Sequence, residues 1–476
     1  MLKKRTKYED LWSSVLANKE NIRKSNVEKE KGKLLGATKG QPAVRQYFEC
    51  TNLQALSRRE LWGNPSGKWN GSKRWCASTK FYIKDLMSYD TDVYKFMGQC
   101  GYITPFVCAF SHSARGGKYI AVGDEEGGIG FIDSRKDNKI ELESARKQFV
   151  AHDNAIFDLQ WSRDDSTIIS ASGDQTARLW DVEKQKCKAV LRGHSCSIKV
   201  VAYNHKDTNV WATASRDGNI FIWDVRTSGS AEKAGARHVR PTVGIISAHG
   251  QQNNSKSVTK TKARSSAGPI RSNPTSSVTG VQWLRHFDYL LASSGALDGI
   301  IKYWDIRKLS PHRGTPEPLT TSVDGSTSKR PHGVSTLLLD HTGTRLFANS
   351  TDNHIYMYDA IRLGPPLSRF THPAYRCSSF YVRMSISPDG RFLVSGSSDK
   401  RMYIWEMDAP GEKPVILKGH ENEVSSVNWC KTDLGLLASV SDDTSLRLWR
   451  VQQSMSEQCR QNPNLLDQHW GVVVDS

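Results

Sequence analysis

The chain has 476 residues, 37% of them hydrophobic and 9% aromatic, which suffices for a large core and excludes a wholly disordered protein. No run approaches the ~20 apolar residues that a membrane span needs, and the first ten residues lack the apolar stretch of a secretion signal. Nine scattered cysteines without a C-x-x-C pair favour reduced thiols in an intracellular protein. We therefore expect no membrane partner, no metal and no cofactor. The net charge of +17 indicates nucleic acid or acidic partners, although solvated loops would also produce it.

The first 74 residues are predicted to be a basic and mostly flexible extension, partly disordered. Within it, residues 41–48 (QPAVRQYF) follow a Q-x-x-aliphatic-x-x-aromatic-aromatic pattern. In a short 3₁₀ turn, Val44, Tyr47 and Phe48 would form one hydrophobic plug while Gln41 supplies hydrogen bonds. The alternative is that this segment begins a strand that packs on the folded domain.

Residues 105–451 contain seven copies of one unit. Each copy has a turn acid followed six residues later by an aromatic residue, and the residues around each pair alternate as in β-strands. The pairs are Glu125/Phe131, Asp174/Trp180, Asp217/Trp223, Asp298/Trp304, Asp352/Tyr358, Asp399/Trp405 and Asp443/Trp449. Units of about 40–45 residues with Gly-His before the first strand and Trp-Asp after the third are typical of WD40 blades. The sequence therefore predicts an all-β fold, a seven-bladed WD40 β-propeller.

Polar residues of this unit have a structural interpretation. In a WD40 blade the His, the turn Asp and the Trp indole share one hydrogen-bonded network with a Ser or Thr between the strands, where an unpaired polar group would cost about 1–3 kcal/mol. We assign this network to three blades, through His152, Asp174 and Trp180, His194, Asp217 and Trp223, and His420, Asp443 and Trp449. A catalytic or metal-binding role for these histidines is not expected.

A propeller must also close its ring, usually with a strand from one terminus that completes the last blade. The tail, residues 452–476, shows little β pattern, so we predict that the segment 75–104 supplies the missing strand.

Two neighbouring blades end alike, in Trp223-Asp224-Val225-Arg226 and Trp304-Asp305-Ile306-Arg307, and the other five segments lack the arginine. Blade geometry predicts that Arg226 and Arg307 project from the bottom face, opposite the turn acids. There, two guanidinium groups could make bidentate contacts with a partner. The alternative is a local Asp–Arg salt bridge that finishes each strand.

A basic insertion, residues 250–276, separates the third and fourth blades and has five cations without an acid: Lys256, Lys260, Lys262, Arg264 and Arg271. Its composition suits phosphate contact, but it lacks interleaved aromatic residues, so a solvated loop is the alternative.

The strings AHDNAIFDLQW, SGDQTARLWDV, GHSCSIKVVAY, RDGNIFIWDVR, LDGIIKYWDIR, TDNHIYMYD and VSGSSDKRMYIW, in this order, resemble the denticleless family, as does the long polar insertion. The resemblance implies a non-catalytic, nuclear substrate receptor of a cullin-RING ubiquitin ligase. Asp224, Arg226, Asp305 and Arg307 would dock on the damaged-DNA-binding adaptor protein. The substrates would be a replication-licensing factor and inhibitor proteins, carrying degrons formed on proliferating cell nuclear antigen, the sliding clamp, in S phase and after DNA damage.

The pattern at 41–48 is similar to a clamp-binding motif, and we expect it to tether the receptor to the clamp. Animal family members carry such a motif in a long tail after the propeller, whereas only about twenty-five residues follow it here. The competing interpretation is a chromatin or histone-binding WD40 scaffold without a ligase. An enzyme is rejected because the sequence has no phosphate-binding loop, nucleophile elbow or metal-ligand cluster.

Overall fold

A computed structural model describes residues 83–98, 101–135, 147–227, 236–250, 277–309, 317–326, 331–452 and 470–473. The segment 41–48 and the five cations of the insertion lie outside these residues, so their predicted roles stay predictions. Within the described ranges, no helix has the length and apolar content needed to cross a membrane.

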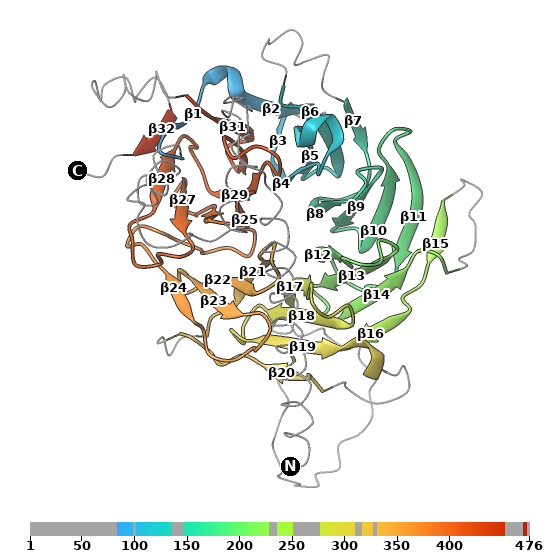
Figure 1. Cartoon of the computed structure of the whole chain (residues 1–476). Coiled ribbons are helices and arrows are strands. Elements are labelled where there is room, and N and C mark those ends of the chain that lie inside the picture. The colour runs from blue at the N-terminus through green and yellow to red at the C-terminus, as the bar shows by residue number, and fades with distance from the viewer. Residues whose placement is uncertain are drawn as a thin grey trace, which may run out of the picture. The chain divides into compact units, whose positions relative to one another are not determined.

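Seven blades of mainly antiparallel strands stand side by side around a central axis (Figure 1), with the strands of blades six and seven joined in one 11-stranded sheet, and this confirms the predicted seven-bladed propeller. Blade one consists of β4 (Pro105–Phe110), β5 (Tyr119–Asp124), β6 (Gly128–Asp133) and β7 (Lys147–Val150). Blade two consists of β8 (Ile156–Trp161), β9 (Thr167–Ser172), β10 (Thr176–Asp181) and β11 (Lys186–Arg192), and β15 (Arg237–Val239) adds to it in parallel. Blade three consists of β12 (Ile198–Tyr203), β13 (Val210–Ser215), β14 (Ile220–Asp224) and β16 (Val243–Ile245).

The remaining blades repeat this plan. Blade four consists of β17 (Val278–Trp283), β18 (Leu290–Gly295), β19 (Ile301–Asp305) and β20 (Thr320–Thr321). Blade five consists of β21 (Val334–Leu339), β22 (Arg345–Ser350), β23 (His354–Asp359) and β24 (Ser368–Phe370). Blade six consists of β25 (Met384–Ile386), β26 (Phe392–Ser395), β27 (Arg401–Glu406) and β28 (Val415–Lys418), and blade seven has β29 (Val424–Trp429), β30 (Leu436–Ser441) and β31 (Ser445–Val451). Short 3₁₀ turns are η1 (Asp90–Asp92), η2 (Ala114–Gly117) and η4 (Ile306–Lys308).

The hydrophobic core lies between the faces of neighbouring sheets. One cluster joins Trp211 of blade three to Ile169 of blade two, and another joins Trp283 of blade four to Ala212 of blade three. Because strand side chains alternate between the two faces of a sheet, each blade contributes one apolar face to each neighbour. The packing between blades therefore depends on the ring being complete.

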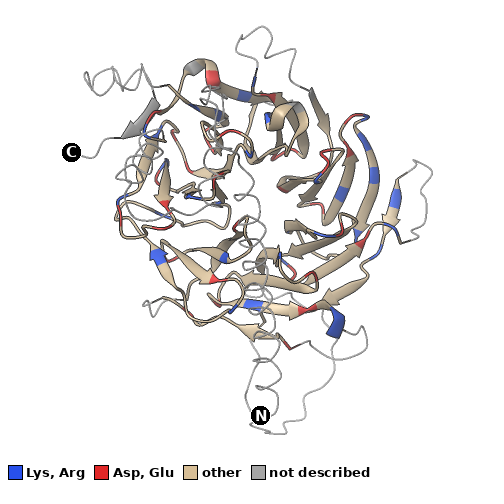
Figure 2. Cartoon of the chain, in the orientation of Figure 1, with Lys and Arg blue, Asp and Glu red and all other residues tan. Residues whose placement is uncertain are grey.

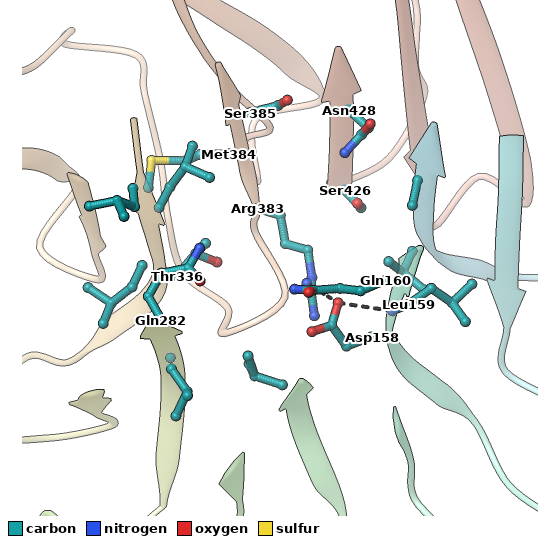
Figure 3. Close-up of a pocket in the computed structure, with 18 of the residues that line it drawn as sticks. Asp158, Leu159, Gln160, Gln282, Thr336, Arg383, Met384, Ser385, Ser426 and Asn428 are labelled. Atoms are coloured by element: carbon teal, nitrogen blue, oxygen red, sulfur yellow. Dashed lines mark hydrogen bonds and ion pairs between the residues drawn. The ribbon is translucent and has the colours of Figure 1, made fainter. Parts of the chain in front are cut away.

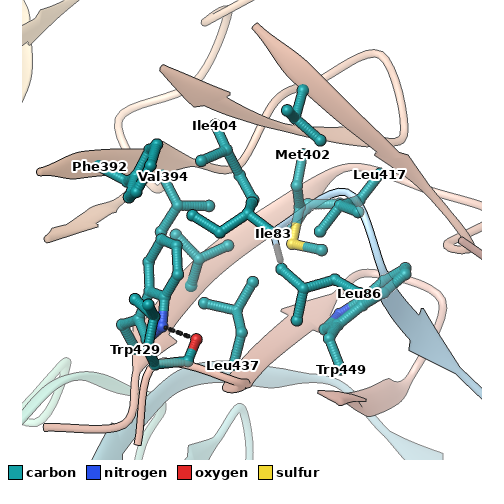
Figure 4. Close-up of a cluster of buried hydrophobic side chains, with 14 residues drawn as sticks. Ile83, Leu86, Phe392, Val394, Met402, Ile404, Leu417, Trp429, Leu437 and Trp449 are labelled. Atoms are coloured by element: carbon teal, nitrogen blue, oxygen red, sulfur yellow. Dashed lines mark hydrogen bonds between the residues drawn. The ribbon is translucent and has the colours of Figure 1, made fainter. Parts of the chain in front are cut away.

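The fourth strand of blade seven comes from the N-terminal side of the propeller. Strands β1 (Leu86–Ser88) and β2 (Val93–Met97) both pair antiparallel with β31, and β3 (Tyr102–Ile103) pairs with β2. Figure 4 shows Ile83 and Leu86 among side chains of blades six and seven, including Met402, Leu417 and Trp449. Both aliphatic side chains are fully buried, and burying each contributes about 1.5–3 kcal/mol.

The expectation that the tail has little β structure is wrong at its end. Strand β32 (Trp470–Val473) pairs with β1 on one side and with β28 on the other. It therefore connects the sheets of blades six and seven. A short apolar run, Trp470-Gly471-Val472-Val473, was the available signal, and its partners are two sheet edges that the sequence does not reveal.

Candidate interaction surfaces

Blade seven contains all the contacts of the predicted blade network. His420 Nδ1 lies 2.8 Å from Asp443 Oδ2, its Nε2 lies 2.7 Å from the Ser439 hydroxyl, and Trp449 Nε1 donates to that hydroxyl at 2.8 Å. The same contacts join His152, Asp174, Ser170 and Trp180 in blade two, and His194, Asp217, Thr213 and Trp223 in blade three.

A fourth network was missed in the sequence. His249 lies 2.8 Å from Ser293 through Nε2 and contacts Asp298 through Nδ1, and Trp304 Nε1 donates to the same Ser293 at 2.8 Å. The long insertion separates His249 from the first strand of its blade, so the usual spacing fails. The remaining signal was the Asp298/Trp304 pair, which predicts a histidine upstream.

Burial favours the neutral form of three of these histidines. Burial lowers the pKa of His152, His249 and His420, although the paired carboxylates oppose it. Burial alone would raise the pKa of Asp443, but hydrogen bonds from His420 and Ser445 outweigh it and hold that pKa well below its usual range. The histidines and aspartates of the networks therefore stabilise the blades that contain them.

At each of the two Asp-x-Arg ends, the arginine makes a bidentate pair with the aspartate, and we call this pair a fork. Arg226 donates to Asp224 through Nε at 2.9 Å and Nη2 at 2.8 Å, and Arg307 donates to Asp305 through the same atoms at 3.0 Å. The hydrogen bond from Arg226 lowers the pKa of Asp224. Each guanidinium is held rigidly by its carboxylate while its Nη1 side points away from it.

Both forks lie on the face of the ring where first strands end, which we call the bottom face. Arg226 Nη2 lies 2.8 Å from Asp207, in the turn after β12, and Arg307 stacks 3.3 Å above the Tyr289 ring, in the turn after β17. In Figure 2 the acidic end of β19 is followed directly by the basic turn η4. The arginine side chains remain 56% and 59% exposed, so both can reach a partner.

The expectation that only two blades carry the arginine is wrong. In blade one, Ala121 pairs with Phe131 and Tyr119 with Asp133, so Ile132, not Phe131, occupies the tryptophan position. Asp133 and Arg135 then stand where the Asp and Arg of the other forks stand. Arg135 donates to Asp133 through Nε at 3.0 Å and Nη2 at 2.9 Å and is 51% exposed.

The opposite, top face holds an aromatic cluster around the axis. The rings of Phe106, Phe157 and Tyr381, from blades one, two and six, have centroids 5.8–6.0 Å apart and interplanar angles of 7–19°. The Lys199 ammonium of blade three sits 3.3 Å over Phe157 and 4.8 Å from the Tyr381 ring. Burial, with Arg216 and Arg383 nearby, lowers the pKa of Lys199 to about 8. No repeat pattern marks these residues, because they meet only when the ring closes.

One ion pair crosses the axis below this cluster. Arg383 of blade six reaches Asp158 of blade two at 2.6 Å and donates to the Phe157 carbonyl at 2.6 Å (Figure 3). Asp158 is 2% exposed and also accepts the Val201 amide of blade three at 2.9 Å. A single buried carboxylate therefore connects three blades.

The WD domain, G-beta repeat model matches residues 144–181, 185–224, 268–305, 367–406 and 411–450. With the ring of seven blades, this defines a WD40 β-propeller protein. The denticleless protein homolog of Gallus gallus is 40% identical over 359 residues, 75% of this chain and 48% of the relative. The Homo sapiens homolog is 38% identical over 358 residues, covering 75% and 48%, and protein lethal(2)denticleless of Drosophila melanogaster is 34% identical over 343 residues, covering 70% and 42%.

The chain belongs to the denticleless family, and the resemblance drawn from the repeat strings is confirmed. It spans about half the length of the curated relatives that it matches.

Proposed function

We propose that this protein is the substrate-recognition subunit of a nuclear cullin-RING ubiquitin ligase. It docks on the damaged-DNA-binding adaptor through its bottom face and presents clamp-bound replication proteins for degradation in S phase and after DNA damage. The observation that carries the proposal is the set of rigid, half-exposed Asp-x-Arg forks on one face. The receptor contributes binding alone, and ubiquitin transfer belongs to other subunits.

The two faces then have separate tasks. Adaptor docking occupies the bottom face, so the substrate degron binds at the top, where Tyr381 and Phe380 are each 42% exposed and Lys199 lies 4.8 Å from the Tyr381 ring. Exposed aromatic rings next to a cation suit an anchor residue of a bound peptide. Tyr381→Ala should therefore reduce substrate capture while adaptor binding is retained.

The adaptor assignment is tested by co-purification of the full chain carrying Arg226→Glu and Arg307→Glu. Each reversed charge leaves the adjacent Asp unpaired and repels an acidic partner, so adaptor recovery should fall by more than tenfold. Lys184→Glu is the matched control, because it reverses a charge in the equivalent turn of blade two, which has no fork. Unchanged recovery with the double variant would reject the adaptor assignment.

The alternative is a chromatin or histone-binding scaffold without a ligase, for which the net charge of +17 is the supporting observation. In that case the wild-type chain would co-purify with histones and not with the adaptor, and the fork variants would behave like the wild type.

The tether at 41–48 is tested by calorimetry with a peptide of residues 36–55 and the clamp. Binding that is lost in a Tyr47→Ala, Phe48→Ala peptide supports the tether, and no binding of the natural peptide rejects it.

Contact between the insertion and DNA is tested through salt dependence. Replacing Lys256, Lys260, Lys262, Arg264 and Arg271 with Gln should flatten the slope of DNA affinity against salt, because fewer counterions are released. An unchanged slope rejects this contact.

A further inference from the structure

A ring of basic side chains surrounds the bottom end of the central axis. It occupies one equivalent position, two residues after the end of the first strand in each blade. Six of the seven blades place a Lys, Arg or His there: His112, Arg163, His205, Arg285, His341 and Lys431, with Pro388 in blade six. The position has no role in the blade networks, so the repeat itself does not require a basic residue there.

Neighbouring members of the ring are in contact. Lys431 Nζ of blade seven lies 2.7 Å from His112 Nε2 of blade one, and Arg285 of blade four donates to the His341 carbonyl of blade five. The Tyr203 ring stands between His112 and His205, with ring centroids 6.4 and 5.2 Å away.

Blade six has no basic residue at this position, but the His341 side chain of blade five lies against its turn. Gly390, with φ of 70°, lies so close to the His341 ring that a side chain there would overlap it. The His341 ring therefore extends the ring of basic side chains over the blade that lacks one.

The ring opens into an axial cavity of about 700 Å³, lined by His112, His205, Arg285, His341 and Lys431, among others. That volume is in the range of small-molecule sites. The Nε2 atom of His205 is buried and has no hydrogen-bond partner among the described residues. Burial is the largest cause that lowers the pKa of His205 to about 4, and the nearby charges of Arg285, Arg163 and Lys431 lower it further.

Few acids offset these charges. Asp165 faces His112, but its carboxylate accepts the amides of His112, Ser113 and Ala114 at 2.6–2.8 Å. Asp340, which also lines the cavity, is paired with Arg345 at 3.3 Å. The mouth therefore has more positive than negative charge.

We propose that the bottom mouth of the channel is a binding site for a compact polyphosphate, held between basic side chains of six blades. The donors converge from around a circle, which suits phosphates arranged around a small ring. An extended acidic peptide presents its carboxylates in a line and would reach only part of the circle. Guanidinium and ammonium groups in a partly desolvated cavity are strong phosphate ligands. The site is independent of the proposed ligase function, although it shares the bottom face.

The test is calorimetry of the full chain at physiological salt with myo-inositol hexakisphosphate as the probe. Tripolyphosphate and a nucleoside triphosphate are parallel arms that distinguish a cyclic from a linear phosphate source. We expect one site per chain and about tenfold weaker binding for Lys431→Gln and for Arg285→Gln. Arg285 is exposed and lines the cavity, so its replacement keeps the test valid if Lys431→Gln perturbs folding.

Lys206→Gln is the matched control. Lys206 is adjacent to His205 but pairs with Asp288 at 2.6 Å and does not line the cavity, so binding should be unchanged. Absence of binding, several weak sites, or equal weakening by Lys206→Gln would overturn the proposal. Tighter binding of an oligoglutamate peptide than of any phosphate would also overturn it and assign the mouth to an acidic protein segment.

Discussion

Two kinds of acid–base pair lie in the blades of this propeller, and the exposure of the basic residue separates them. Inside blade seven, His420 is 6% exposed and bonds to Asp443, whereas on the bottom face Arg226 is 56% exposed beside Asp224. Breaking a buried pair leaves a polar group without water or partner, while water replaces an exposed one. The buried pairs therefore hold the blades together, and the exposed pairs remain available to a partner.

The largest expected effect concerns the buried pair across the axis. Arg383→Ala leaves the Asp158 carboxyl without its partner and nearly inaccessible to water, so we expect a loss of about 3–5 kcal/mol in the free energy of unfolding, measured by chemical denaturation. Adding Asp158→Asn should recover part of the loss, because no charge is then buried. A loss below about 1 kcal/mol would mean that water reaches Asp158.

The blade networks should have the next largest effect. His420→Ala removes one partner each from Asp443 and Ser439, and we expect a loss of about 1–3 kcal/mol in denaturation experiments. Tyr403→Phe is the comparison in blade six, where a tyrosine hydroxyl donates to Asp399 in place of a histidine. A similar loss in both variants would show that the hydrogen bond matters more than the residue that makes it.

The same histidines should make stability depend on pH. Burial lowers the pKa of His420 in the folded state, so the unfolded chain binds more protons below pH 6.5 and stability falls as the pH decreases. Each such histidine contributes up to about 1.4 kcal/mol per pH unit. Melting curves between pH 7.5 and 5.5 measure this slope, which His420→Gln should reduce. Tyr403→Phe should lower the melting temperature similarly at both pH values, and an unaltered slope in His420→Gln would contradict the assignment.

The smallest effect on stability is expected for the forks. Arg226→Ala with Arg307→Ala removes two guanidinium groups that are more than half exposed, and Lys308 remains 4.0 Å from the buried Asp305 carboxylate, so the melting temperature should change little. If the double variant melts many degrees lower, the forks are structural and the comparison between buried and exposed pairs fails. A triple variant that also carries Arg135→Ala tests whether the fork of blade one contributes to partner binding.

Local sequence predicted much of the blade interior. The spacing of His, Asp and Trp identified three networks, because each network is built within about thirty residues of one blade. The spacing did not identify the network of His249, because an insertion separates this histidine from the first strand of its blade. It also failed in blade one, where Ile132 replaces the tryptophan and the aromatic Phe131 shifted the alignment by one residue. That shift concealed the fork of Asp133 and Arg135.

The sequence by itself determined the repeat, the number of blades and the family, because strand alternation and turn residues are local properties. Only the tertiary structure decided which residues from different blades meet around the axis. Arg383 and Asp158 are separated by 225 residues, and the basic ring draws on six blades. Such contacts arise when the closing strands β1 and β2 complete blade seven, since closure brings the ends of the first strands together around one axis.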